Sequence, residues 1–321
     1  MAINKLVMAA LKALSYPDID IKRNYKWERQ VENVAHYHYL KPFYKAWDHK
    51  VSCGDHEVPV RIFSSVVPVS SAAHAASASG PLPLLVYFHG GGWVLGNIDS
   101  YDKVCANMAR LTNHLVVSVD YRLAPEYKFP AAPEDCYAVA REIFLHTNLL
   151  NTPAENITLI GDSAGANLAA VVSLMARDRG EFLPRRQILI YPATYNDHTE
   201  HSFFDSVREN GTDYLLTSKR VCDYMDLYKS SDEDLHNPYF APLLAKSLAD
   251  QPDTLVITAE YDPLRDEGEE YARKLRKFGN QVQLHRVADG LHGFFSLPPS
   301  FPQVKECYEI INRFLSEVPQ E

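Results

Sequence analysis

The sequence predicts an α/β fold in which a mostly parallel central sheet is covered by helices on both faces. From residue 82 onward, short apolar runs such as "LPLLVYFH" (82–89), "LVVSVDY" (115–121) and "ITLI" (157–160) alternate with segments of helical periodicity. Strands buried on both faces are unbroken apolar runs, and the helices between them form the crossovers of a parallel sheet. This alternation continues almost to the end of the chain, which favours a single large sheet.

The other elements follow in the same alternating order. Apolar runs of strand length recur at 185–193, 254–262 and 281–287, and a hairpin is expected at 49–65 around the Gly54–Asp55 turn. Segments of helical periodicity are found at 101–113, 131–147, 165–178 and 304–318.

Two blocks depart from this order. Residues 1–48 read as helical and rich in aromatic side chains, and residues 195–240 contain helical pieces without an obvious strand. We predict that these blocks form one helical cap over an α/β catalytic domain of residues 49–194 and 241–321. A second, independent domain is the alternative, but pieces of about 45 residues can bury little core alone.

Composition limits the partners and the compartment. The formal net charge of −9 disfavours nucleic acid or an anionic membrane as the main partner. The five cysteines are scattered and odd in number, which predicts reduced thiols in a cytoplasmic protein, without disulfides or a zinc or other metal site. No apolar run reaches the roughly 18 residues of a membrane helix. Because Lys12 interrupts the first apolar run, we interpret the start as an amphipathic helix and not a signal peptide, and expect no stable membrane anchor.

The stretch "IGDSAGAN" (160–167) places Ser163 between a predicted strand and a predicted helix. The pattern G-x-S-x-G at such a junction is typical of a turn that presents a nucleophilic serine at the carboxyl end of a sheet. Gly161 and Gly165 indicate a turn too tight for side chains at those positions. Alone, the pattern is also compatible with a turn of no chemical role.

A serine nucleophile needs a base and an orienting acid, which follow it in the order acid, then histidine. The histidines that follow Ser163 are His198, His201, His236, His285 and His292. We select His292, because it lies in the Gly-flanked loop "ADGLHGFF" directly after a strand. The carboxylates after the strand "TLVITAEYD" are Glu260, Asp262, Asp266 and Glu267. We select Asp262, which ends the strand before Pro263, whereas the last two suit the first turn of a helix.

An acyl-transfer site also needs donors for the developing oxyanion. The segment "FHGGGWVLG" (88–96) follows a strand, and its glycines let backbone N–H groups turn into the site. We predict that Gly91, Gly92 and the N–H of Ala164 form the oxyanion hole. His89 is expected to support this loop by hydrogen bonding and not to act as an acid or base.

Several of these motifs together resemble a known family. "HGGGW", "DYRLAPE", "FPAAPED", "GDSAGANLA", "DPLRDEG" and "LHGF", with the cap segments "RENGTDYLLT" and "NPYFAPLLA", are similar to the hormone-sensitive-lipase-like carboxylesterases of the α/β-hydrolase fold. The resemblance spans residues 80–300. It implies a Ser163–Asp262–His292 triad, an oxyanion hole at Gly91, Gly92 and Ala164, and hydrolysis of short- to medium-chain acyl esters without a cofactor. Arg122 and Glu126 of "YRLAPE" are expected to fix a loop.

The resulting hypothesis is a serine esterase that acts on a small-molecule ester through an acyl-enzyme. A peptidase or amidase on the same fold is the alternative, for which Arg208 and the acidic run 232–234 could supply charged anchors. A non-catalytic receptor would be expected to lack part of the triad. A homodimer is left open. Side chains that could shape the acyl pocket, or equally form core, are Trp27, Tyr37, Tyr39, Phe43, Phe203 and Phe204.

Overall fold

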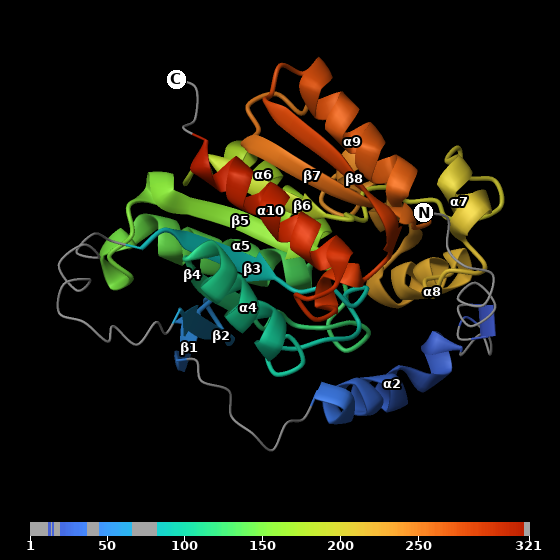
Figure 1. Ribbon diagram of the computed structural model, residues 1–321, viewed down its shortest axis with the longest axis horizontal. Helices are drawn as coiled ribbons and strands as arrows, with labels where there is room; N and C mark the ends of the chain where they lie inside the picture. The colour runs from blue at the N-terminus through green and yellow to red at the C-terminus, as the bar shows by residue number, and fades with distance from the viewer. Residues whose placement is uncertain (1–11, 14, 16–19, 37–44, 66–81, 318–321) are drawn as a thin grey trace.

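The computed structural model describes residues 12–13, 15, 20–36, 45–65 and 82–317 (Figure 1). Within them, one eight-stranded sheet has the order β1-β2-β4-β3-β5-β6-β7-β8. Strands β3 to β8 are parallel, and the hairpin β1–β2 is added antiparallel to β4. The strands are β1 (Lys45–Ser52), β2 (Glu57–Ser64), β3 (Leu84–Phe88), β4 (Leu115–Val119), β5 (Ile157–Asp162), β6 (Arg186–Ile190), β7 (Asp253–Tyr261) and β8 (Val282–Leu291).

Helices cover both faces of this sheet, as the sequence predicts (Figure 1). The helices are α2 (Ile21–His36), α4 (Asp102–Thr112), α5 (Ala131–Leu145), α6 (Ala164–Arg179), α7 (Asp205–Asn210), α8 (Ser218–Tyr228), α9 (Arg265–Lys277) and α10 (Pro302–Ser316). Short 3₁₀ helices lie at Thr147–Leu149, Ala154–Asn156, Asp232–His236, Pro242–Leu244 and Phe294–Ser296. Helices α4 and α10 share an apolar core with one face, and α5, α6 and α9 share a second core with the other.

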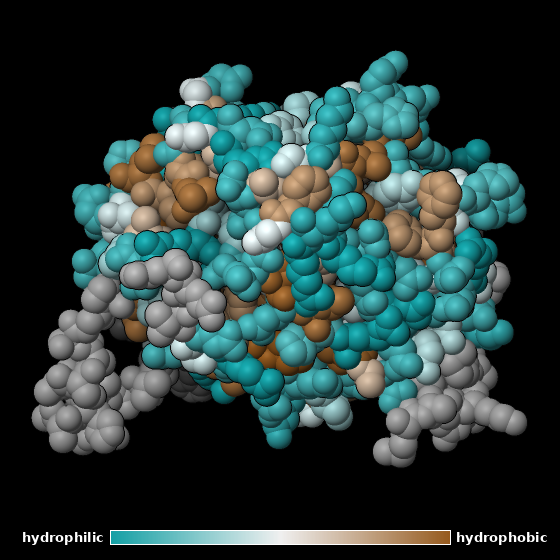
Figure 2. Space-filling model, turned by 90° about the horizontal axis from the view of Figure 1, so that it is seen from above, coloured by the Kyte–Doolittle hydropathy of each residue, from teal (hydrophilic) through white to brown (hydrophobic). Residues whose placement is uncertain are grey.

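The central strands are buried on both faces because an apolar core packs against each face of the sheet. All five residues of β3 are buried, and Val86 belongs to one core while Leu85 belongs to the other. Side chains alternate along a strand, so two apolar cores require an unbroken apolar sequence. The outer surface differs: in Figure 2 hydrophilic side chains dominate the visible face and apolar ones form separate groups. Among the described residues, no helix is long and apolar enough to cross a bilayer.

The predicted hairpin is present, but it begins earlier than expected. Strand β1 starts at Lys45, before residue 48, where the predicted cap ends, so the expected helical character of residues 45–48 is wrong. Residues 46–50 are exposed, so β1 lacks the buried apolar run that marks the central strands. The expected N-terminal helix over residues 1–18 and the segment 37–44 lie largely outside the described residues.

Helices of the two predicted cap blocks lie side by side. Helix α2 packs on α8, and the Arg220 guanidinium donates to Glu28 at 2.7 Å. Arg29 of α2 also donates to the carbonyls of Val94 and Ala124, which are in loops that follow β3 and β4. Arginine can make several such bonds at once because its donors form a planar fork. Arg29 therefore joins α2 directly to loops of the α/β domain.

The buried carboxylate of Asp135 joins the helix α5 to the turn of the β1–β2 hairpin and to the loop after β4. Asp135 of α5 is fully buried and accepts hydrogen bonds from the guanidinium and the backbone N–H of Arg122. The His56 Nε2 lies 2.8 Å from the same carboxylate, and the pKa of His56 is raised by its hydrogen bond to Asp55 and by this one to Asp135. Arg122 and, through its ion pair with Arg29, Glu126 thus hold the loop after β4, as expected.

We predict that Arg122→Leu lowers the free energy of unfolding by about 3 kcal/mol, because it leaves the buried Asp135 carboxylate without its main cation. Urea denaturation at pH 7 measures the change. Arg185→Leu, at an exposed position, is the control and should change stability by less than about 0.5 kcal/mol. Equal stability of the two variants would contradict the role given to the Arg122–Asp135 pair.

Candidate active site

Ser163 lies on the sharp turn between β5 and α6, with φ 55° and ψ −121°. Its backbone N–H donates to the Ile190 carbonyl at 2.9 Å, which ties the turn to β6. A Cβ on Gly161 would lie 2.2 Å from the Gly165 carbonyl oxygen, and one on Gly165 would lie 2.0 Å from that of Phe88. Both glycines are therefore required by close backbone packing, as the sequence predicts.

The structure brings Ser163, His292 and Asp262 together at the carboxyl edge of the sheet. His292 directly follows β8, and Asp262 directly follows β7. The distance from Ser163 Oγ to His292 Nε2 is 2.8 Å, and that from His292 Nδ1 to Asp262 Oδ2 is 2.7 Å. Because a carboxylate only accepts, Nδ1 carries the proton and Nε2 is free to accept the serine hydroxyl. Asp262 is fully buried, and His292 is slightly exposed.

The other candidate histidines lie elsewhere. His285 is in the interior of β8, His236 is in a 3₁₀ helix, and His201 is exposed. His198 is buried and its Nε2 lies 2.5 Å from Glu267. Sequence reasoning missed this pair: it assigned Glu267 to the helix dipole, whereas the carboxylate also accepts the backbone N–H groups of Thr194 and Tyr195.

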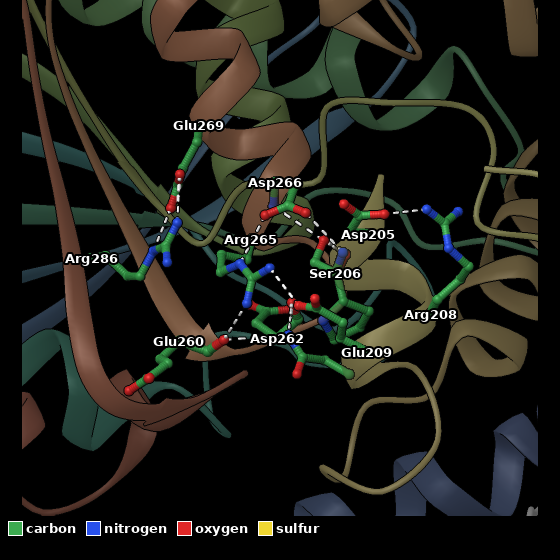
Figure 3. Close-up of polar contacts among 12 residues, drawn as sticks. Asp205, Ser206, Arg208, Glu209, Glu260, Asp262, Arg265, Asp266, Glu269 and Arg286 are labelled. Atoms are coloured by element: carbon green, nitrogen blue, oxygen red, sulfur yellow. Dashed lines mark hydrogen bonds and ion pairs between the residues drawn. The ribbon is translucent and has the colours of Figure 1, made fainter. Parts of the chain in front are cut away.

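The turn that carries Asp262 is held by the helix α7 (Figure 3). Asn210 donates to the Asp262 carbonyl at 3.1 Å, and the Ser206 hydroxyl donates to the Pro263 carbonyl at 2.8 Å. Arg265 extends this contact, because its guanidinium binds Glu209 of α7 and the carbonyl of Glu260. A segment of the predicted cap thus fixes the position of the carboxylate. No sequence motif indicated this connection.

The glycines after β3 line the same pocket as Ser163 and Ala164. Gly91 has φ 109° and Gly92 has φ 61°, values that side-chain-bearing residues rarely adopt. A Cβ on Gly91 would lie 2.3 Å from the Leu95 carbonyl oxygen, and one on Gly92 would lie 2.5 Å from the Tyr224 ring. Glycine is therefore required at both positions, and both line the pocket in which the predicted oxyanion donors are needed.

His89 supports this loop from within the core. The ring is fully buried, stacks on Tyr121 at 4.3 Å between centroids, and donates from Nδ1 to the Gly90 carbonyl at 2.7 Å. The Tyr121 hydroxyl donates to the His89 carbonyl at 2.7 Å. Burial lowers the pKa of His89 to about 4, so its ring is neutral at pH 7. Among the described residues Nε2 has no partner.

The pocket above Ser163 has a volume of about 150 Å³. Apolar side chains from the loops and from α8 form its walls, and the largest of these are Trp93, Tyr101, Leu216, Val221, Tyr224 and Leu264. The aromatic residues proposed from the sequence are absent from the described lining: Phe203 and Trp27 are exposed, and Phe204 packs on Tyr195. Tyr37, Tyr39 and Phe43 lie outside the described residues.

Comparison with known proteins agrees with this architecture. A family model described as the alpha/beta hydrolase fold matches residues 85–296. An arylesterase of Saccharolobus solfataricus is 36% identical over 258 residues, which are 80% of this chain and 79% of the relative. An ethyl acetate hydrolase of Pseudomonas putida is 34% identical over 243 residues, 75% of this chain and 73% of the relative. The solved esterase of Pyrobaculum calidifontis superposes with a TM-score of 0.83, at 35% identity and 98% coverage of both chains.

The fold and these likenesses define the class: the protein is a hydrolase of carboxylic esters. Within that class, the chain belongs to the hormone-sensitive-lipase-like family of carboxylesterases on the α/β-hydrolase fold, as its motifs indicate.

The neutral state of buried His89 predicts a pH-dependent loss of stability. Its pKa of about 4 in the folded protein lies below the value of about 6.5 in the unfolded chain, so the unfolded chain binds the proton first as the pH falls. The contribution of the neutral His89 ring to the free energy of unfolding is therefore fully present above pH 6.5 and is lost as the pH falls toward 4. The amide introduced by His89→Asn would keep a donor near the position of Nδ1 without titrating. Relative to this variant, the wild type should therefore lose about 2.5 kcal/mol of unfolding free energy between pH 7.5 and 4.5.

Urea unfolding of both proteins at the two pH values measures this difference, and every other titrating group cancels in the comparison. A stability difference between the two proteins that is independent of pH would contradict a neutral, buried His89.

Proposed function

We propose that the protein is a serine carboxylesterase that hydrolyses short- to medium-chain acyl esters through an acyl-enzyme intermediate. Ser163 is the nucleophile, His292 the general base and then the general acid, and Asp262 the carboxylate that orients the imidazole. The observation that carries the proposal is the continuous hydrogen-bonded path from the Ser163 hydroxyl through His292 to the buried Asp262 carboxylate, with distances of 2.8 and 2.7 Å.

The chemistry follows from this geometry. As Ser163 Oγ attacks the ester carbonyl, His292 Nε2 takes its proton, and the imidazolium is stabilised by Asp262. The carbonyl oxygen becomes negative and is bound by the backbone N–H groups of Gly91, Gly92 and Ala164. His292 then protonates the leaving alcohol. Water, activated by the same imidazole, releases the acid from Ser163, so each step needs only protein groups and water.

The pocket supports a small acyl group. A volume of about 150 Å³ is below the roughly 300 Å³ at which pockets for drug-sized ligands begin. Apart from Ser163 and His292, its described lining is mostly apolar, with polar groups from Asp162, Ser296 and the two tyrosines, which suits an uncharged ester. We propose that α2, α7 and α8 act as the cap over the catalytic domain, since Leu216, Val221 and Tyr224 close the pocket from that side.

Nothing in the described pocket favours the peptidase alternative. Arg208 pairs with Asp205 and donates to the Ser202 carbonyl, so it is engaged on the surface of α7 (Figure 3). Asp234 caps the 3₁₀ helix Asp232–His236 at Ser231. These charged groups do not line the pocket. Substrate binding therefore depends on apolar contacts and the oxyanion donors.

Initial rates with p-nitrophenyl esters from acetate to palmitate test the proposal. We expect turnover to be greatest for short chains, because the pocket is small, and to fall steeply toward palmitate. Ser163→Ala should lower kcat/KM by roughly 10⁴-fold or more for every ester, because the nucleophile and its base act as a unit. Ser173→Ala, which changes a buried serine on the same helix away from the pocket, is the control and should retain activity. Substantial turnover by Ser163→Ala would exclude Ser163 as the nucleophile.

A further inference from the structure

Asp162, the residue before the nucleophile, is a buried carboxylate to which the steps above assign no role. It ends β5, and its side chain is almost completely inaccessible to solvent. Its Oδ1 accepts the Tyr87 hydroxyl at 2.6 Å and the backbone N–H of Gly90 at 2.9 Å, and its Oδ2 lies 3.4 Å from the Tyr191 hydroxyl. Both tyrosines are themselves buried.

The carboxylate is packed directly against residues 90–92 after β3, the segment with the proposed oxyanion donors, here called the oxyanion loop. A Cβ on Gly90 would lie 2.6 Å from Asp162 Oδ2 and 2.9 Å from the Tyr101 hydroxyl, so a side chain there would displace the carboxylate. Because β3 and β5 are neighbouring strands, with Phe88 opposite Gly161, Asp162 reaches across their ends to Gly90. The hydrogen bond from Gly90 therefore holds the start of the segment that carries the Gly91 and Gly92 donors.

The charge environment of Asp162 is unusual. A buried carboxylate is unfavourable unless it is paired, yet its hydrogen-bond partners in the described structure include no lysine or arginine. Burial raises the pKa of Asp162, while the bonds from Tyr87 and Gly90 and the nearby His292 act in the opposite direction. Both donors stabilise the ionised form and so oppose the effect of burial, although the net effect is a raised pKa.

His292 is the group near Asp162 that becomes cationic during the reaction. Tyr191 lies between them, with its ring centroid 4.7 Å from that of His292 and its hydroxyl toward Asp162. The charged and titratable groups around the imidazole are Asp262 from the end of β7, Asp162 from the end of β5, and Tyr191 from the segment after β6. The imidazolium thus forms in contact with the Asp262 carboxylate and near a second carboxylate, Asp162, through Tyr191.

We propose that Asp162 is a positioning residue of the esterase, which fastens the oxyanion loop to the nucleophile turn and adds a second negative charge to the surroundings of His292. The proposal rests on the function proposed above. The Asp162 side chain has two effects. Its hydrogen bond with Gly90 holds the donors that stabilise the transition-state oxyanion, and its negative charge stabilises the His292 imidazolium. Both effects favour the transition state over the bound substrate, so kcat and not KM should report them.

Asp162→Asn tests the proposal, since asparagine keeps the shape and the acceptor for Tyr87 and Gly90 but removes the charge. We expect kcat with p-nitrophenyl acetate to fall about tenfold while KM changes little, because charge-assisted hydrogen bonds are roughly twice as strong as neutral ones. Because a neighbouring negative charge favours a cationic imidazolium, its removal should move the acid limb of the kcat/KM profile to lower pH. A purely structural role would leave that limb in place.

Two further variants make the result specific. Asp135→Asn changes another fully buried carboxylate, remote from the site, and should leave the acid limb at its wild-type position. Tyr87→Phe removes a hydrogen-bond donor to Asp162 but keeps the carboxylate charge. It should lower kcat without moving the acid limb of the kcat/KM profile to lower pH. This variant tests the positioning role of Asp162 if Asp162→Asn does not fold.

The outcomes distinguish the two proposals. An active wild type whose Asp162→Asn variant keeps its kcat, or loses rate with an unmoved acid limb, would overturn the role of Asp162 alone. A folded wild type that hydrolyses no ester would overturn the proposed function together with it.

Discussion

The site depends on one steric constraint, the contact between two backbone segments at the turn from β5 to α6. Because Gly161 and Gly165 lack side chains, the strand end and the first turn of the helix can touch, and α6 can rest on the carbonyl of Phe88 in β3. Ser163 is left at the tip in a strained backbone conformation. The same close packing places the start of α6 beside the oxyanion loop, so the candidate nucleophile and its candidate donors come from adjoining strand ends.

Several carboxylates are buried around this turn, among the apolar side chains of the core. Asp162, Asp262 and Glu267 are buried carboxylates, and each accepts backbone N–H groups, from Gly90, from Leu264, and from Thr194 and Tyr195 respectively. A carboxylate bound in this way acts as a rigid connector between loops that share no secondary structure. The catalytic geometry proposed for Ser163, His292 and Asp262 therefore rests on a network that extends into α7.

Sequence patterns predicted the parts of this arrangement that are local. The Ser163 turn, the glycine loop after β3 and the positions of Asp262 and His292 after strands each follow from a few consecutive residues. The contacts of Asn210 with Asp262, of His198 with Glu267 and of Tyr87 with Asp162 join residues far apart in the chain and leave no local pattern. The pocket walls were misjudged for a related reason: apolar periodicity does not distinguish a side chain that is exposed, such as Phe203, from one that lines a cavity, such as Leu216. Strand β1 was placed too late because an exposed edge strand lacks an apolar run.

The central claim is that Ser163 forms a covalent bond with the acyl group of the substrate. The most direct measurement is reaction of the purified protein with a p-nitrophenyl alkylphosphonate, which transfers its phosphonyl group to an activated serine and releases p-nitrophenol, followed by mass spectrometry of the digested chain. The account predicts one p-nitrophenol released per chain, one label on the peptide that contains Ser163, and loss of esterase activity in proportion to labelling. Full labelling at another residue, or undiminished ester hydrolysis by completely labelled protein, would contradict it.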